Sequence, residues 1–329
     1  MPYASRTEPV VHRSLTTLAL LAFTACAQDA PNQDQPADSS PSLPTRPNEP
    51  LGPAGSDHAL DILTWNLERF PKRGSETQQH LTTVLSAIQP DIVAVQEIVD
   101  ASALFEVADA MPGWKADVAS FFDPSGPYNP PVGMLWNSTT IHVRQRYLLF
   151  DNEDHLAFPR APLVLEFTWK NIDFVVINVH LKALGDNVIQ HDDPNDEEVR
   201  RLRACERLEH HIRLHLPHAR VIVVGDFNDR IEEPPQTNVF SPFLERPAEY
   251  LFADMSIATD PDAVVSYPRY TSHIDHVLIT NELFAATWHP DSFTRTIPVD
   301  RVFMTSWGHY ASVLSDHRPV LYHLDGSSD

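Results

Sequence analysis

The sequence predicts an α/β fold in a single domain that spans residues 57–329. Short runs of apolar, β-branched residues recur along this part of the chain and are typical of buried strands. Stretches in which apolar residues follow helical spacing lie between several of these runs. No internal repeat and no Pro/Gly/Ser-rich break divides the region, and its length is within the range of one large α/β domain.

Residues 1–26 have the features of a secretion signal. Two arginines precede a mostly apolar run at residues 15–23, which is well short of the ~20 residues that a membrane-spanning helix needs. The run leads into Phe23-Thr-Ala-Cys26, which resembles a bacterial lipobox although Phe23 replaces the commoner leucine. We therefore expect lipidation of Cys26 and a location in the cell envelope. The alternative is a plain secretory signal cut near Ala27, which would release the protein.

Residues 27–56 are predicted to be a disordered tether. They are rich in Pro, Ser, Asn, Gln and Asp and contain almost no aromatic or β-branched residues. Such a segment cannot bury enough apolar surface to offset its ordering entropy. If Cys26 carries lipid, this segment supplies a flexible connection between a membrane surface and the globular domain.

Cysteine usage and charge limit the classes of partner. The chain has two cysteines, Cys26 and Cys205, so a lipidated Cys26 leaves Cys205 as a free, buried thiol on a helix. The formal net charge is -21 at pH 7. A chain this acidic repels polyanions at long range, which argues against tight, sequence-reading binding of nucleic acid. Metal-assisted contact with a phosphodiester remains compatible, because a bound cation reverses the local field.

Polar side chains follow the first two predicted strands. Residues 60–65 form the first strand, which delivers Asn66 and Glu68 at its end. A helix is predicted over residues 76–88 with Ser75 as its cap, and a second buried strand at residues 92–95 ends on Gln96 and Glu97. A carboxylate directly after four buried apolar residues is costly unless it is paired or holds a metal, which makes Glu97 a candidate ligand.

The middle of the chain alternates strands with a long helix. A short helix at residues 101–110 and strands at 133–136, 141–143 and 163–167 precede a strand at 174–179. That strand ends on His180 and Lys182; a lone histidine in such a place is more often structural than catalytic. Residues 185–198 are expected to be a solvated acidic loop; a secondary cation site there stays open, although the spacing does not indicate one. Residues 197–216 form an amphipathic helix, and Arg200 or Arg201 near its start could reach a bound anion.

The strongest signal is the buried strand at residues 221–224, which Gly225 ends. Asp226, Asn228 and Asp229 follow at once, and this spacing suits a divalent cation or a phosphoryl oxygen, although an ordinary Asx-rich turn would look the same. Residues 232–268 are expected to be surface loops. Further on, Asp275 and His276 begin a short strand, and Asp316 and His317 directly precede the terminal strand.

Taken together, these motifs resemble those of the endonuclease/exonuclease/phosphatase superfamily, the deoxyribonuclease I-like fold. The resemblance rests on Thr64-Trp-Asn-Leu-Glu68, Val95-Gln-Glu97, Asn178-Val-His180, Gly225-Asp-Phe-Asn228, Ile274-Asp-His-Val277 and Ser315-Asp-His317, which occur in the family's order. It implies a four-layer α/β sandwich of two packed mixed β-sheets flanked by helices. It also implies a phosphoesterase site along one edge that depends on Mg²⁺, with Mn²⁺ or Ca²⁺ as alternatives.

The resemblance also implies roles for individual residues. Glu97 would hold the principal metal, with Asn66, Glu68 and Asp316 as nearby or second-site ligands. Asp226 and Asn228 would orient the attacking water and the phosphate. His317, steered by Asp275, would act as acid/base or stabilise the transition state, and His180 would contribute a second imidazole. Lys182 would contact a phosphate, unless it is a solvated surface lysine.

The residues leave the substrate open. His180-Leu-Lys182, the arginine-bearing helix and the Gly-Asp-Phe-Asn-Asp segment are most similar to extracellular bacterial nucleases of this superfamily. The favoured hypothesis is therefore a monomeric, extracytoplasmic endonuclease that acts on DNA. The alternative is a phosphoesterase that acts on phospholipid, sphingomyelin or inositol phosphate. A surface protein that keeps the fold for binding alone is disfavoured, because no motif position carries an inert replacement.

Overall fold

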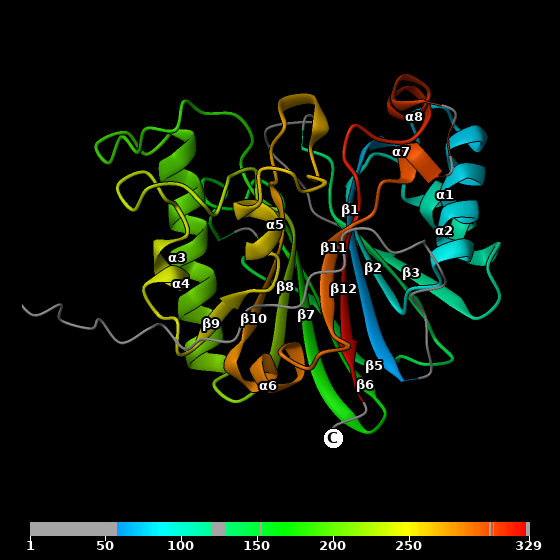
Figure 1. The fold of residues 1–329 in the computed structure, drawn as a ribbon, viewed down its shortest axis with the longest axis horizontal. Coiled ribbons are helices and arrows are strands. Elements are labelled where there is room, and N and C mark those ends of the chain that lie inside the picture. Colours follow the sequence, from blue (N-terminus) through cyan, green and yellow to red (C-terminus); the bar gives the residue numbers. More distant parts are fainter. Residues whose placement is uncertain (1–57, 120–128, 152, 303, 305, 327–329) are drawn as a thin grey trace, which may run out of the picture. The chain divides into compact units, whose positions relative to one another are not determined.

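The computed structural model describes residues 58–119, 129–151, 153–302, 304 and 306–326 (Figure 1). The expected signal peptide at residues 1–26, Cys26 and the expected tether at 27–56 lie outside these residues. The predicted α/β domain is therefore described almost completely. Within the described residues, no helix combines the length and the apolar character needed to cross a bilayer.

Two six-stranded mixed sheets form the centre of the fold. The first has the order β11-β12-β1-β2-β4-β3, with bounds Phe293–Thr296, Val320–Asp325, Ala59–Phe70, Ile92–Ile98, Gly133–Asn137 and Trp114–Val118. The second has the order β5-β6-β7-β8-β10-β9, with bounds His142–Leu148, Leu163–Trp169, Ile172–His180, Arg220–Asp226, Asp275–Thr280 and Tyr250–Phe252. Parallel pairing joins β1 to β2 and β7 to β8, and all other neighbours run antiparallel.

Three hydrophobic layers hold the sheets and helices together. Side chains alternate along β1, so Ile62 packs between the two sheets whereas Leu63 packs against the outer helices. The helices α1, Ser75–Ile88, and α2, Ala101–Asp109, cover the outer face of the first sheet. On the other side α3, Glu197–His215, covers the second sheet (Figure 1). Two sheets between two helical layers confirm the predicted four-layer sandwich.

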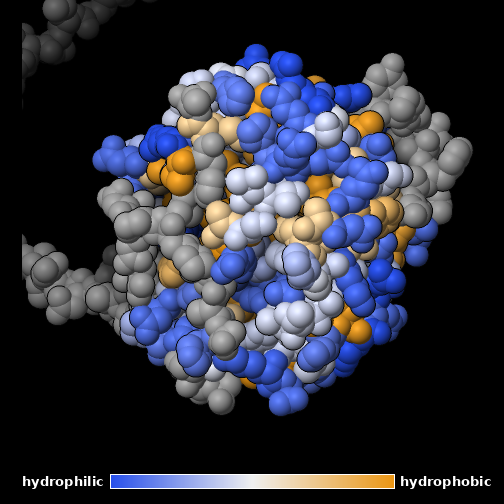
Figure 2. Space-filling view, turned by 90° about the vertical axis from the view of Figure 1, so that its right-hand side faces the viewer, coloured by the Kyte–Doolittle hydropathy of each residue, from blue (hydrophilic) through white to orange (hydrophobic). Residues whose placement is uncertain are grey.

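The helices that cover the sheets are amphipathic. Hydrophilic residues cover most of the face that carries α1 and α2, and the hydrophobic spots on it are small and separate (Figure 2). On α3, Cys205 points into the core as a free thiol, as predicted, and burial raises its pKa. The prediction that Ser75 caps α1 is wrong. The helix begins at Ser75 and no side chain caps its N-terminus; instead, the Arg73 amide donates to the Thr77 hydroxyl.

Several short elements were not predicted. Residues 232–268, expected to be surface loops, contain α4 (Ser241–Leu244), β9 and α5 (Met255–Thr259). The edge strands β3 and β11 and the helices α6 (Phe284–Thr287), α7 (Val299–Val302) and α8 (Trp307–Val313) were also missed. Elements of three to seven residues are too short to show a period, so they depend on packing against the larger layers.

The arrangement of strands creates one edge where polar residues gather. The parallel strands β1, β2, β7 and β8 all end there, and β10, which runs antiparallel to β8, begins there. Asp275 pairs directly with Asp226 in the β10–β8 register, and His180 pairs with Asp226 across β7 and β8. Ligand sites of α/β sheets form at such carboxyl ends.

Candidate active site

The edge of the two sheets opens into a cleft of about 600 Å³. Most of the residues predicted from the strand ends line it: Asn66, Glu68, Glu97, His180, Asp226, Asn228, Asp316 and His317. Asp275 lies behind His317 and contacts it. Residues as far apart in the sequence as Asn66 and His317 thus meet in one place, which is the convergence that a catalytic site requires.

Asp226 lies at the centre of the cleft. Its Oδ2 accepts a hydrogen bond of 2.8 Å from the amide of Asn66 and lies 3.6 Å from Nε2 of His180 and 3.9 Å from Nε2 of His317. Its Oδ1 accepts the backbone N–H of Asn228 at 2.9 Å. Burial raises the pKa of Asp226 to about 7, and the charge of Asp275 adds to this effect. A carboxylate with this pKa can accept a proton near neutral pH.

Gly225 allows Asp226 to reach this position. Its φ is +148°, and a Cβ at this position would lie 2.0 Å from the carbonyl oxygen of Val179 on the neighbouring strand. Only glycine therefore permits the close pairing of β7 and β8 at their carboxyl ends. This pairing holds His180 beside Asp226, while Asn228 donates from its amide to the carbonyl of Leu181 at 3.2 Å.

His317 is held by a carboxylate and by an aromatic ring. Its Nδ1 donates to Oδ2 of Asp275 at 2.8 Å, which leaves Nε2 directed toward Asp226 and Asp316. The ring stacks on Tyr267 with 4.5 Å between centroids. Burial alone would lower the pKa of His317, but the carboxylates of Asp275, Asp226 and Asp316 outweigh it and raise the pKa to about 10. His317 is therefore a protonated donor at neutral pH.

His180 has the opposite character. Burial lowers its pKa well below the usual value, and the positive charges of Arg160 and His317 lower it further. Among the described residues, its Nδ1 is buried without a hydrogen-bond partner. The cleft therefore presents one charged and one neutral imidazole, which separates their chemical roles.

The rim of the cleft carries the predicted metal ligands. Oε2 of Glu97 accepts the backbone N–H of Arg69 at 3.0 Å, and Glu68 forms a short ion pair with Lys72. Burial raises the pKa of Glu68; Lys72 opposes the rise and nearby Asp316 adds to it. Positive φ angles of 63° at Glu97 and 42° at Glu68 show an uncommon backbone where both strands end. Carboxylate oxygens are the ligands that a hard divalent cation prefers.

Asn66 is placed differently from the other predicted ligands. Its amide nitrogen donates to Asp226 at 2.8 Å and lies 3.4 Å from Oε1 of Glu97. Its amide oxygen accepts the backbone N–H of Glu68 at 2.9 Å. Asn66 thus connects the rim carboxylates to Asp226, and its role as a metal ligand stays a prediction.

Lys182 is not brought into the cleft. Its Nζ donates to the carbonyl of Ala183 and forms a 3.2 Å ion pair with Glu197 at the start of α3. The strand β7 ends at His180, so the alternation of a strand no longer sets the direction of the Lys182 side chain. The geometry gives no support to the predicted phosphate contact and favours the surface alternative.

A buried polar network beneath the cleft was missed in the sequence. The amide of Gln96 on β2 donates to Oδ1 of Asn178 on β7 at 2.8 Å. The amide of Asn178 donates in turn to the carbonyls of Val95 at 3.0 Å and Gly133 at 2.8 Å. The network joins the two sheets directly below Glu97 and His180, so it fixes their relative positions. Both residues belong to the motifs noted above, but their spacing gives no sign that they touch.

Other residues that line the cleft were also missed or only partly foreseen. Tyr267, Tyr270, Ser272, Arg230 and Glu233 lie in segments that showed no periodicity. Arg201, one of the two arginines expected near an anion, lines the cleft, but its guanidinium is buried and its Nε donates to Asp229 at 2.7 Å. Arg200 instead donates to the carbonyl of Leu156.

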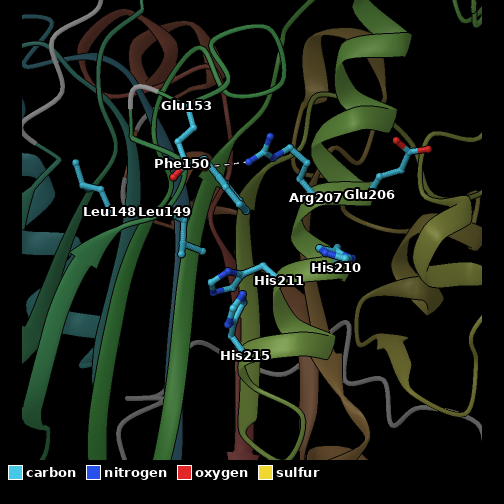
Figure 3. Close-up of a pocket in the computed structure, with 9 residues that line it drawn as sticks. All are labelled: Leu148, Leu149, Phe150, Glu153, Glu206, Arg207, His210, His211 and His215. Atoms are coloured by element: carbon cyan, nitrogen blue, oxygen red, sulfur yellow. Dashed lines mark hydrogen bonds and ion pairs between the residues drawn. The ribbon is translucent and has the colours of Figure 1, made fainter.

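A second hollow of about 700 Å³ lies between α3 and the segment that follows β5 (Figure 3). The rings of His211 and His215 face one another there with centroids 4.8 Å apart, and the guanidinium of Arg207 lies 4.8 Å from the ring of Phe150. None of the residues that line this hollow belongs to the predicted set. The candidate active site is therefore the cleft around Asp226.

The fold and the cleft define a protein of the deoxyribonuclease I-like class. The sequence matches the model of the Endonuclease/Exonuclease/phosphatase family over residues 63–321, and the chain belongs to this family. No curated protein matches the sequence.

Solved structures with the same fold come from several organisms. They include a D. rerio TDP2 humanized by 14 mutations, with TM-score 0.58, 13% identity, and coverage of 82% of this chain and 100% of that chain. A family member from Bacteroides vulgatus has TM-score 0.56, 12% identity, and coverage of 81% and 98%. The human Nocturnin catalytic domain with a bound sulfate anion has TM-score 0.54, 14% identity, and coverage of 81% and 94%. Identities this low establish the fold alone.

Proposed function

We propose that this protein is a metal-dependent phosphodiester hydrolase that cleaves DNA as an endonuclease. The observation that carries the proposal is the convergence of Glu97, Asp226 and the Asp275–His317 pair in one cleft. Membership of a family named for endonucleases, exonucleases and phosphatases supports the same reaction class. Hydrolysis requires an oriented water, neutralisation of the phosphoryl charge, and a proton for the leaving oxygen.

The residues of the cleft can perform the proton transfers. Asp226, with a pKa near neutrality, accepts the proton of the attacking water, and Asn228 orients the water or the phosphate beside it. His317, charged and steered by Asp275, donates a proton or a hydrogen bond to the phosphoryl group as the P–O bond breaks. Neutral His180 adds a second imidazole on the other side of Asp226.

Glu97, with Glu68, Asp316 and Asn66 nearby, would hold the cation, for which Mg²⁺ is proposed. When bound, such a cation polarises a phosphoryl oxygen and offsets its negative charge. The fit rests on the type of donor, because Glu97, Glu68 and Asp316 all present carboxylate oxygens to the same cleft. Among the described residues that line the cleft, the imidazoles of His180 and His317 are the nitrogen ligands that would favour a transition metal, and no cysteine is present.

Features at the mouth of the cleft support a nucleic-acid substrate. Tyr270 is 64% exposed, packs beside Tyr267 with centroids 5.3 Å apart, and is covered on one side by Arg269. Exposed aromatic rings next to a phosphoesterase site can stack on unpaired bases. A solved structure of D. rerio TDP2, which shares the fold, is complexed with single-strand DNA product. The acidic character of the chain predicts weak binding that depends on the cation.

We also propose an extracytoplasmic location. The support is the sequence of residues 1–26, with lipidation of Cys26 anchoring a monomer to a membrane through residues 27–56. Metabolic labelling with a radioactive fatty acid tests this point: label should enter the wild-type chain and not a Cys26→Ala variant. Incorporation into neither chain would favour the secreted alternative.

The reaction is tested by incubating the full chain with plasmid DNA, with Mg²⁺ and with chelator. The wild type should nick DNA only with the cation, and Glu97→Gln should lose at least about 100-fold in rate. Glu76→Gln removes an equal charge from an exposed position on α1 and should leave the rate unchanged. Cleavage of sphingomyelin, inositol phosphate or bis-p-nitrophenyl phosphate with intact DNA would favour the alternative substrate class. Turnover of none of them with any divalent cation would contradict the proposal.

A further inference from the structure

The loop between β7 and α3 brings three carboxylates together at the rim of the cleft. One oxygen each of Asp186, Asp196 and Glu198 lies within 4.8 Å of the others. Asp186 is exposed, whereas Asp196 is 7% and Glu198 only 1% exposed. The sequence had suggested a solvated acidic loop, and the burial of two of its acids is unexpected. Three carboxylates at this spacing repel one another unless a positive charge compensates them.

Glu198 is an incompletely paired carboxylate. Its Oε1 accepts the backbone N–H of Asn187 at 2.7 Å and lies 3.1 Å from Nη2 of Arg201. Its Oε2 is buried and has no hydrogen-bond partner among the described residues. A buried carboxylate oxygen without a partner is strongly unfavourable, so this atom indicates that a ligand belongs beside it.

Arg201 cannot balance the charge of the cluster. Its Nε donates to Asp229 at 2.7 Å, and its Nη1 donates to the carbonyls of Lys182 at 2.8 Å and Leu184 at 2.6 Å. The single positive charge of this side chain is therefore shared between Glu198 and Asp229. The Asp186 and Asp196 side chains each accept backbone amides of the loop and of the start of α3, which leaves their negative charge in place.

We propose that Asp186, Asp196 and Glu198 bind a Ca²⁺ ion that is separate from the catalytic cation. The three side chains supply only oxygen ligands, which suits a hard cation. Ca²⁺ accepts irregular coordination by six to eight oxygens and tolerates ligands from a loop, whereas Mg²⁺ demands a near-octahedral site. Exposure of Asp186 leaves room for water on the solvent side of the ion.

Such an ion would fix the rim of the catalytic cleft. The cluster joins the loop at Asp186 to the first turn of α3, where Asp196 is the N-cap. Gly185 and Asn187, on either side of Asp186, both line the cleft. The backbone of Gly185 lies so close to Glu198 that a Cβ would meet its Oε1 at 2.1 Å. Binding should therefore order this part of the rim and raise the thermal stability of the whole domain.

The test measures binding without turnover. Full-length protein freed of metal with chelator is titrated with CaCl₂ in excess Mg²⁺ by isothermal titration calorimetry, and thermal unfolding is followed with and without Ca²⁺. The wild type should bind one Ca²⁺ and unfold at a higher temperature with it. Asp186→Asn and Asp196→Asn should each weaken binding at least about tenfold and lose most of the thermal shift.

Matched variants separate this site from the catalytic one. Asp192→Asn removes the same charge from an exposed position of the same loop, outside the cluster, and should bind Ca²⁺ as the wild type does. Asp196→Asn keeps an oxygen that can cap α3, and Asp186 is exposed, so at least one variant should fold normally. Glu97→Gln should also retain the binding event.

Two results would overturn the inference: no Ca²⁺ binding to the wild type in excess Mg²⁺, or loss of binding in Glu97→Gln with retention in both cluster variants. Neither result bears on whether the protein hydrolyses DNA, so the two proposals fail separately.

Discussion

Replacing Asp275 by asparagine should remove most of the catalytic activity while leaving the protein folded. The substitution keeps the shape of the side chain but deletes the charge that holds Nδ1 of His317 at 2.8 Å. Oδ1 of Asp275 is buried and, among the described residues, has no hydrogen-bond partner, so an amide group there would find no acceptor. Breaking a buried pair of this kind costs about 3–5 kcal/mol of stability, and a misplaced acid/base group costs about 10²–10⁴ in kcat.

The matched control is Asp254→Asn. Asp254 is also fully buried and bonds to a histidine, His276, at 2.6 Å, but it does not line the cleft. Both variants should unfold at a lower temperature than the wild type, whereas only Asp275→Asn should lose kcat. The assay is release of p-nitrophenolate from bis-p-nitrophenyl phosphate, well below the unfolding temperature of each variant. A near wild-type kcat in Asp275→Asn, or an equal loss in Asp254→Asn, would refute the role given to this pair.

Three further predictions concern stability and the surface. Gly225→Ala should destabilise the domain by roughly 2 kcal/mol or more, seen in urea unfolding, because its Cβ would collide with the carbonyl of Val179. The second prediction concerns the buried pair of Asp254 and His276. Burial alone would raise the pKa of Asp254 and lower that of His276. Their mutual attraction outweighs burial, so the pKa of Asp254 lies below its usual value and that of His276 lies above it. The stability that Asp254→Asn removes should therefore be largest between about pH 4 and 6.5, shrinking as Asp254 protonates in acid and as His276 deprotonates in base; a constant difference would contradict this. Lys182→Ala should leave kcat/KM unchanged, because Lys182 pairs with Glu197. A tenfold loss would instead support a contact between Lys182 and the phosphate of the substrate.

The site residues at the ends of the strands could be predicted because two local patterns occur together there: an apolar run and the polar residues that follow it. A run such as Val221–Val224 indicates a buried strand, and polar residues directly after it must lie at the sheet edge. The placement of Asp226, Glu97 and His317 in one cleft agrees with this reasoning. The seven-residue strand β8 and the nineteen-residue helix α3 were long enough for their pattern to show.

The remaining features depend on contacts that sequence spacing does not encode. Gln96 and Asn178 meet only because two different sheets pack face to face. Tyr267 reaches His317 from a segment with no period, so nothing local marks it as part of the site. For Lys182, proximity to His180 along the chain suggested a shared site, but β7 ends at His180 and the Lys182 side chain pairs with Glu197 instead, so its contact with phosphate stays a prediction.

The charge of the cleft explains how an acidic protein could act on a polyanion. Glu68, Glu97, Asp226 and Asp316 all lie in the cleft, and Lys72 is already paired with Glu68. A phosphodiester would be repelled from such a surface unless a cation entered with it. In the proposed mechanism the chain would therefore supply orientation and proton transfer, and the bound ion would supply most of the charge neutralisation. Affinity for substrate and affinity for cation are then thermodynamically linked, because each reduces the electrostatic cost of binding the other.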